Sequence, residues 1–238
     1  MPSNKLDRTR IARLWQSILA ITERRELLFG ELTSRLLDRH PEDRIPHPGF
    51  VGSHYVPGGL LFLGMNPGAG GNGLDPDELL HYHLLKQLQN ATPQTLVQAF
   101  QNLIEYDTRW YPSIRIMQVI VQPVLAGAGL TYDSIAYINV LKWRTAGSSG
   151  LMPLYKISLA AHTLAQLAEL NPATIAVLGV GVAKCLAKLP EFQDRYGKRC
   201  ITIPRQRGDY RLPPEGHAAV VKIVSHLRSK FYPSRNTT

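Results

Sequence analysis

Two kinds of apolar pattern follow one another along the chain, and together they predict an α/β fold. Short continuous apolar runs, typical of strands buried on both faces of a parallel sheet, occupy 60–63, 134–141, 174–178 and 200–203. Between these runs the apolar residues recur at helical spacing. Strands that alternate with helices indicate βαβ units. We therefore expect a three-layer α/β/α sandwich around a central, mainly parallel, four-stranded sheet.

The same patterns divide the chain into three parts. Helical spacing over 5–38 predicts an amphipathic helix or helix pair. A stretch rich in Pro, Gly and His follows at 40–59 and is typical of an irregular connection. We expect an N-terminal helical extension over 1–45, one α/β domain over 46–230 and a loose tail over 231–238.

Length and composition favour a globular protein of the cytoplasm. The chain has 238 residues, of which 44% are apolar, so it can bury a full core without disulfides or metals. Its N-terminus has no apolar signal-peptide core, and no run is long enough to span a membrane. The lone cysteines Cys185 and Cys200 form no CxxC pair, which excludes a zinc ribbon, a redox dithiol and a four-cysteine iron–sulfur cluster.

The charge balance points to an anionic partner. The net charge is +9 and the isoelectric point is about 9.7. Such an excess attracts polyanions, so DNA, RNA and an anionic membrane surface all remain candidates. A basic protein without an anionic partner is the open alternative.

The histidines give no sign of a metal site. His40, His47 and His54 lie in the Pro-rich connection at a spacing that matches no metal signature, so we expect them on the surface or in loops. His81 and His83 would point to divergent faces of a helix. We expect no metal and no organic cofactor.

Three predicted strands end directly in loops suited to ligand binding, after Leu63, Ile138 and Ile203. Parallel strands share one direction, so these loops would meet at one edge of the sheet, where ligands of open α/β sheets bind. The first loop has the glycine spacing of a dinucleotide fingerprint over 68–73, but the region about 20 residues further on, 89–93, has neither an acidic residue nor a strand. A dinucleotide-dependent enzyme therefore rests on glycine spacing alone.

Two of these strand ends resemble one known family. Gly64-Met65-Asn66-Pro67-Gly68, after an apolar strand, resembles the first motif of the uracil-DNA glycosylase superfamily, most closely that of its single-strand-selective and mismatch-specific branches. The segment 138–144 (INVLKWR) is similar to the strand end where the family carries its base-reading asparagine. The segment 175–179 and the small-residue helix after it resemble the next landmark of the family. The resemblance spans roughly 58–228 and leaves the N-terminal helices outside.

The resemblance implies a monofunctional DNA glycosylase that flips uracil or a related damaged base out of DNA and hydrolyses it from the sugar. The sequence leaves the oligomeric state open, and we expect a monomer. The chain departs from the family after the last strand. There the family has a histidine that stabilises negative charge on the departing base, whereas this chain has Ile203 before Pro204. A catalytically weak module that binds nucleobases or nucleic acid on the same fold is the alternative that this departure favours.

The resemblance also implies the roles of two asparagines. Asn66 would lie near the sugar C1′ atom and orient water, and the alternative is a turn asparagine before proline. Asn139 would read the base, because an amide offers one acceptor beside one donor and so distinguishes uracil from cytosine. The alternative for Asn139 is a strand-end residue that caps the following loop.

Further residues complete the predicted site. The other residues expected to contact the base are Gly64, Met65, Pro67, Gly68, Trp110 and Tyr111. Those expected to bind DNA phosphates are Arg144, Arg205 and Arg207, with Arg211 in the same loop as a further clamp and Lys142 adding positive charge. The glycines would let the backbone approach the ligand closely, and one of the two aromatic residues would stack on the base. The alternatives are core aromatic residues and a solvated basic loop.

Overall fold

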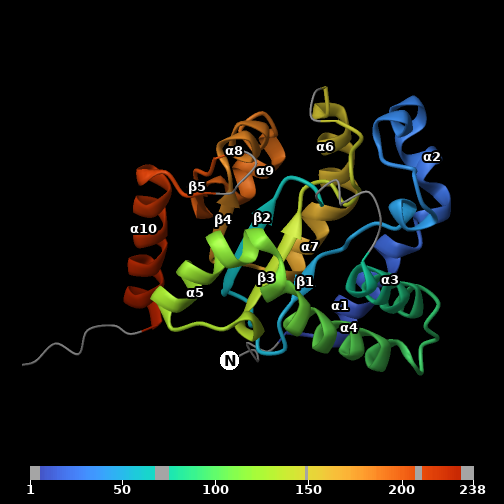
Figure 1. Ribbon diagram of the computed structural model, residues 1–238, viewed down its shortest axis with the longest axis horizontal. Helices are drawn as coiled ribbons and strands as arrows, with labels where there is room; N and C mark the ends of the chain where they lie inside the picture. Colours follow the sequence, from blue (N-terminus) through green and yellow to red (C-terminus); the bar gives the residue numbers. More distant parts are fainter. Residues whose placement is uncertain (1–5, 68–74, 148–149, 207–210, 232–238) are drawn as a thin grey trace, which may run out of the picture.

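The computed structural model describes residues 6–67, 75–147, 150–206 and 211–231 (Figure 1). Its centre is a mixed five-stranded sheet in the order β1-β3-β2-β4-β5. The strands are β1 (Phe50–Val51), β2 (Leu60–Gly64), β3 (Ile135–Asn139), β4 (Thr174–Leu178) and β5 (Cys200–Ile203). Strands β2 to β5 pair in parallel, and β1 pairs antiparallel with β3. The chain is therefore an α/β protein, as the sequence predicts.

The prediction of four strands is wrong by one edge strand. β1 lies inside the stretch that we expected to be irregular, where Phe50 pairs with Tyr137 of β3. Two residues are too few to show a periodic signal, so only the tertiary pairing defines this strand. β3 is shorter than its apolar run, because the chain leaves the sheet after Asn139, although Val140 N–H still donates to the Gly64 carbonyl at 3.0 Å.

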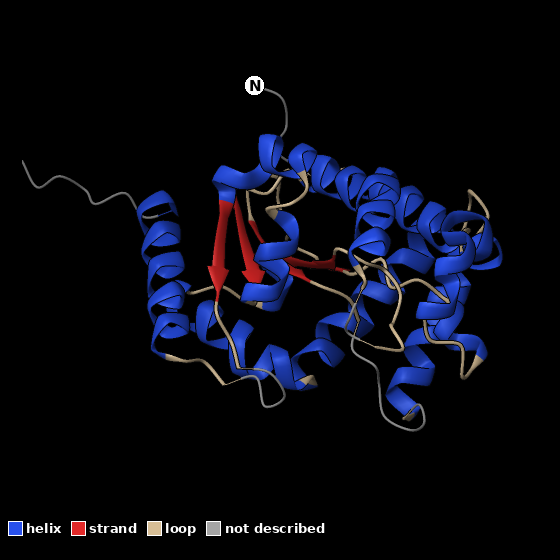
Figure 2. Cartoon of the chain, turned by 90° about the horizontal axis from the view of Figure 1, so that it is seen from above, coloured by secondary structure: helices blue, strands red, loops and turns tan. Residues whose placement is uncertain are grey.

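Side chains alternate between the two faces of the sheet, and each face has its own hydrophobic cluster. In β2, Leu61 and Leu63 belong to one cluster, and Leu60 and Phe62 to the other. The helices with residues in the first cluster are α1 (Arg8–Leu19), α2 (Arg25–Phe29), α3 (Pro76–Gln89), α4 (Leu96–Trp110), α6 (Met152–Ser158), α7 (Leu164–Leu170), α8 (Val180–Leu186) and α9 (Pro190–Tyr196). Those with residues in the second are α5 (Gln122–Ala128) and α10 (Pro214–Phe231). Helices thus flank the sheet on both sides, consistent with three layers (Figure 2).

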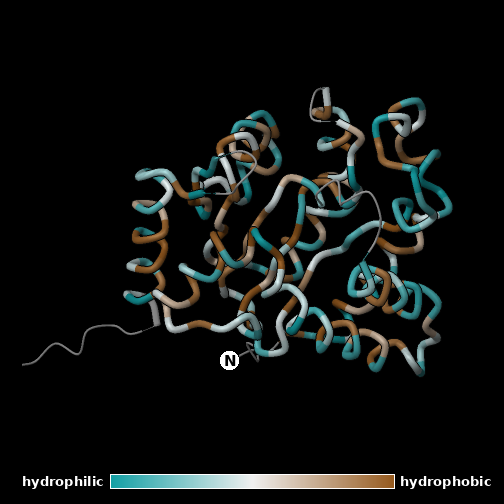
Figure 3. Tube along the Cα trace, viewed as in Figure 1, coloured by the Kyte–Doolittle hydropathy of each residue, from teal (hydrophilic) through white to brown (hydrophobic). Residues whose placement is uncertain are grey.

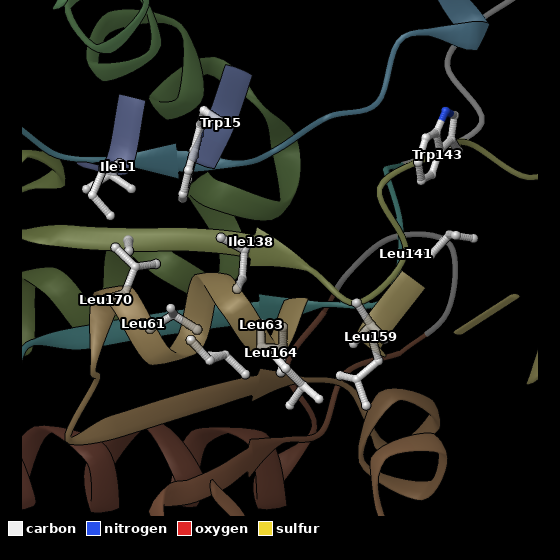
Figure 4. Close-up of a cluster of buried hydrophobic side chains, with 14 of the residues drawn as sticks. Ile11, Trp15, Leu61, Leu63, Ile138, Leu141, Trp143, Leu159, Leu164 and Leu170 are labelled. Carbon is white, nitrogen blue, oxygen red and sulfur yellow. The ribbon is translucent and has the colours of Figure 1, made fainter. Parts of the chain in front are cut away.

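The N-terminal helix α1 belongs to the core of the sheet. Ile11 and Trp15 are almost completely buried in the same cluster as Leu61 and Ile138 (Figure 4). The indole Nε1–H of Trp15 donates to the Gly49 carbonyl oxygen at 3.0 Å. The predicted division into an extension over 1–45 and a domain over 46–230 therefore does not correspond to a break in the packing.

Most predicted helices are present, with local irregularities. Of the helix or helix pair expected over 5–38, the structure has the pair, since α1 ends at Leu19 and α2 follows it between 3₁₀ turns. Two π-helical turns, Met117–Val121 and Leu159–Thr163, interrupt the later helices. Brown and teal segments alternate along the helices in Figure 3, because one side of each packs on the core. No helix in the described part of the chain is long and apolar enough to cross a membrane. The predicted tail lies outside the described residues, apart from Phe231 at the end of α10.

Candidate functional site

A cavity of about 460 Å³ opens at the carboxyl edge of the parallel strands. It is lined by Asn66 after β2, Asn139 at the end of β3, Leu178 at the end of β4 and Arg205 after β5. This volume lies within the range of small-molecule sites in proteins. The sheet edge predicted from the three strand-end loops is therefore the edge that carries the cavity.

The structure brings most of the predicted site residues together. The predicted residues that line the cavity are Gly64, Met65, Asn66, Pro67, Trp110, Tyr111, Asn139, Arg144 and Arg205. The predicted residues Gly68 and Arg207 lie outside the described residues. The lining residues that the sequence did not single out include His47, Asp75, Glu78 and Tyr137.

Asn139 is buried, and its side chain is held in one orientation. The hydroxyl of Tyr137, two residues earlier on the same face of β3, donates to Asn139 Oδ1 at 3.3 Å. Because the amide oxygen accepts this bond, the amide nitrogen is turned the other way. The Asn139 amide therefore offers a ligand two groups in a fixed order. These are the N–H of the amide nitrogen, which donates, and the second lone pair of Oδ1, which accepts.

Gly64 leaves the space that the Asn139 side chain occupies. A Cβ atom at Gly64 would overlap Asn139 Oδ1 and would lie 2.8 Å from the Tyr137 hydroxyl oxygen. The end of β2 must therefore lack a side chain for the amide to lie over it. This close approach explains why glycine stands at the start of the 64–68 motif. The reason is space for the amide, since the φ angle of Gly64 is not positive.

Replacing Gly64 with alanine is expected to move the Asn139 amide. Overpacking of this kind costs about 1–3 kcal/mol of unfolding free energy. A displacement of about 1 Å at a reacting group costs about 10²-fold in rate, so ligand affinity or turnover at the cavity should fall much more than stability. Urea unfolding and a binding or activity assay measure the two effects.

Gly147→Ala is the matched control, because a Cβ atom there meets nothing within 4 Å. The control should behave like the wild type in both measurements. Unchanged function in Gly64→Ala would show that the position of the Asn139 amide is unimportant.

Lys142 has a structural place that the sequence did not predict. We expected it to add positive charge at the site, but its side chain is 0% exposed and its Nζ atom donates to the Asn139 carbonyl oxygen. Thr163 Oγ1 donates to the same carbonyl at 3.3 Å. Burial holds the pKa of Lys142 well below its usual 10.5. Lys142 therefore supports the backbone beneath Asn139 and adds little to the field felt by a polyanion.

Replacing Lys142 with methionine is expected to stabilise the fold at neutral pH. Since the folded-state pKa is lowered, unfolding takes up a proton at pH values between that pKa and 10.5. The wild type loses about 1.4 kcal/mol of unfolding free energy per pH unit as the pH falls through this range. Methionine has no such term, so the variant's advantage should grow as the pH falls from about 10.5 toward the folded-state pKa of Lys142 and should level off below that pKa.

Urea unfolding at a series of pH values measures this effect. Lys156→Met is the control, because Lys156 is exposed on α6. A difference between wild type and Lys142→Met that does not change with pH would contradict the prediction.

Asn66 is half-buried at the cavity wall. Its amide nitrogen donates to the Pro67 carbonyl at 2.8 Å and to Thr145 Oγ1 at 3.3 Å. Both hydrogen bonds that Asn66 makes within the described ranges use this nitrogen. Its carbonyl oxygen Oδ1 is therefore the atom suited to accept a hydrogen bond from a water molecule or a ligand.

Trp110 offers the better stacking surface of the two predicted aromatic residues. Tyr111 is almost completely buried, with its ring stacked on Phe50 at 5.2 Å between centroids. Trp110 is half-buried, lines the cavity, and rests on the His81 ring at 4.7 Å. A planar ligand can therefore stack on Trp110 while Tyr111 supports the wall from the core.

Beneath Trp110 lies a buried acid–base pair. His81 Nε2 is 3.2 Å from Asp107 Oδ1, and both side chains are buried. Burial raises the pKa of Asp107 above its usual 3.8. His83 is exposed, so the prediction that these two histidines diverge is confirmed.

Arg144 is not placed to bind DNA phosphates at the surface, in contrast to the prediction. It is 5% exposed, its guanidinium forms an ion pair with Glu78, and it lies 5.9 Å from the Tyr82 ring centroid. A buried charge must be paired, so its charge is used inside the wall. The pair ties the start of α3 to the segment after β3.

His47 lies in a loop, one of the two positions that the sequence predicts, but its side chain is buried. It is buried at the cavity wall, where its ring Nε2 lies 2.8 Å from the Tyr82 hydroxyl. Burial, with smaller contributions from His81 and Arg144, holds the pKa of His47 well below its usual 6.5, so the ring is neutral. No local pattern in the Pro-rich connection signals this position, since it depends on packing against α3.

The assembled site suits a flat, polar ligand. It combines an oriented amide, an indole face, a neutral imidazole and two arginines, and the described residues contain no cluster of three or more His, Cys, Asp or Glu side chains that could hold a metal. No protein-family model matches the chain, and no curated protein does.

Proposed function

We propose that the cavity receives a nucleobase turned out of DNA and that the protein hydrolyses the bond between this base and its sugar. The observation that carries the proposal is the Asn139 amide, which the Tyr137 hydroxyl orients at 3.3 Å beside the cavity. A flipped base requires hydrogen bonds to its edge and a surface on which to stack, and Trp110 supplies the second. The resemblance of 64–68 and 138–144 to uracil-DNA glycosylase motifs supports the same conclusion.

Uracil is the base that the amide suits best. Its N3–H and O4 groups place a donor beside an acceptor, which complements the acceptor and donor of Asn139. Cytosine presents the reverse order at these atoms. Because a buried amide left unpaired costs about 1–3 kcal/mol, a fixed amide discriminates between the two bases.

Hydrolysis needs a water molecule at C1′ and a departing base. The water oxygen bonds to C1′, the N–C1′ bond breaks with its electron pair on the base, and the water proton passes to solvent. Asn66 Oδ1 can orient the water, although a neutral amide is a weak base. Positioning of the reactants by the cavity therefore supplies much of the rate in this mechanism.

The charge favours a polyanionic partner, and the motif resemblance favours DNA among such partners. The chain has a net charge of +9, and phosphate contacts dominate affinity for nucleic acid. We expect binding that weakens steeply as salt increases. Fluorescence anisotropy of labelled oligonucleotides at several salt concentrations measures this slope.

Base release from defined oligonucleotides tests the proposal. Single- and double-stranded substrates carry one U, a U·G or T·G mismatch, or one deaminated purine, and alkali-induced strand breaks report the abasic product. Breaks that disappear in both Asn66→Ala and Asn139→Ala would support a glycosylase and identify its base. No product from any substrate would reject hydrolysis.

A binding module is the second candidate, and a particular observation favours it. Ile203, which stands where the related family has its catalytic histidine, is completely buried in the second hydrophobic cluster. No side chain from that position acts in the cavity. Salt-sensitive binding of DNA without base release would favour this candidate over the enzyme.

A further inference from the structure

Two cavity side chains lie over glycines at adjacent strand ends. The Asn139 amide comes from β3 and lies over Gly64 of β2, where a Cβ atom would overlap it. Arg205 comes from the loop after β5 and lies over Gly179, just beyond β4, where a Cβ atom would be 3.3 Å from Arg205 Nε. Gly179 has φ +108°, a conformation that also favours glycine.

These contacts place the two side chains in the wall of one cavity, each over the end of a neighbouring strand. In the sheet, β2 and β4 are neighbours, about 4.8 Å apart, while β3 and β5 lie on their outer sides. Asn139 therefore extends inward from one side and Arg205 from the other, and both line the cavity. From this placement we expect a ligand that is hydrogen-bonded to the Asn139 amide to have the Arg205 guanidinium on its other side.

The other charged side chains at the cavity lie on its α3 side, away from Arg205. Among the described residues, the charged ones that line the cavity are Asp75, Glu78, Arg144 and Arg205. Glu78 pairs with Arg144, and Asp75 is an exposed residue whose carboxylate accepts the Glu78 backbone N–H at 2.7 Å. All three lie toward α3 and the segment after β3, so Arg205 is the cation on the β4 side within the described part of the lining.

A base that leaves a sugar takes the electron pair of the broken bond and becomes an anion. A preorganised cation at the site of developing charge lowers the barrier of such a step. We propose that Arg205 is a catalytic residue that stabilises the departing base as an anion, an inference that rests on the proposed function. The guanidinium thus acts on the base itself, not on the DNA phosphates.

Leaving-group dependence tests this role. Uracil is a poorer leaving group than 5-fluorouracil, so it depends more on charge stabilisation. Arg205→Met is expected to lower single-turnover release of uracil about 100-fold and release of 5-fluorouracil about 10-fold, with partial rescue by Arg205→Lys. Arg115→Met, an exposed arginine outside the cavity lining, should change neither rate more than about twofold.

The outcome separates the possible roles. Equal losses for the two bases would overturn the proposal, because a positioning or folding defect does not depend on the leaving group. A loss confined to DNA affinity, with a shallower salt dependence and unchanged single-turnover rates, would assign Arg205 to a phosphate and also overturn it.

The pKa of a bound free base tests the role of Arg205 separately from base release. Free 5-nitrouracil changes its absorption when it ionises, so its pKa can be measured in the bound state. The wild type is expected to lower this pKa by about 1 unit or more, and Arg205→Met to remove the shift. If the wild type releases no base, the proposed function fails, and this titration still decides whether Arg205 holds a base anion; no shift in the wild type would overturn the inference.

Discussion

Replacing Asn139 with alanine is expected to lower the rate of base release about 10²- to 10³-fold, which is the effect of removing one preorganised hydrogen-bonding group from an active site. The amide lines the cavity, and Tyr137 fixes its orientation. The variant keeps the backbone carbonyl that accepts from Lys142 and Thr163, so the strand end should stay folded. Single-turnover kinetics on a uracil-containing oligonucleotide measure the loss.

Asn139→Asp provides the control of matched shape. A carboxylate still accepts from Tyr137 but cannot donate to a base carbonyl. Asn139→Asp should therefore lose uracil release nearly as completely as Asn139→Ala. Its urea unfolding midpoint should be similar to that of Asn139→Ala. Full activity in Asn139→Asp would show that the amide does not read the base.

Replacing Trp15 with alanine is expected to cost about 3–5 kcal/mol of unfolding free energy, the range for a large aromatic side chain in a packed core. Trp15 is 1% exposed, packs in the cluster of the central sheet and donates to the Gly49 carbonyl. Urea unfolding measures this effect. The transition should be monitored by a signal from the sheet and not by a signal from α1 alone.

Leu27→Ala is the control for the Trp15 variant, since Leu27 is 85% exposed and its loss should change the unfolding free energy by about 0.5 kcal/mol or less. A Trp15→Ala protein whose sheet unfolds like that of the wild type would mean that the first 45 residues are a separate extension after all.

The sequence predicts the parallel strands well because each strand is signalled by its own short apolar run. Continuous apolar runs such as 174–178 are long enough to show that both faces are buried, and β4 has these bounds. The common edge of the site follows from the shared direction of parallel strands. Asn66 and Asn139 could be placed at that edge without knowledge of the packing.

Other parts depend on packing between distant segments, which no local pattern shows. β1 is defined by two residues that pair with β3. Lys142 and Arg144 have the charge typical of surface residues, yet the chain turns them into the wall, where a carbonyl and Glu78 compensate them. His47 is buried because α3 covers it through Tyr82.

The most direct test of base removal by this cavity is mass-spectrometric detection of free base. Wild-type protein is incubated with an oligonucleotide that contains a single uracil. We predict release of uracil with an abasic product of matching mass, and loss of both products in Asn139→Ala. DNA that stays intact through many binding events, or equal release by wild type and Asn139→Ala, would contradict the proposal that this cavity removes a base.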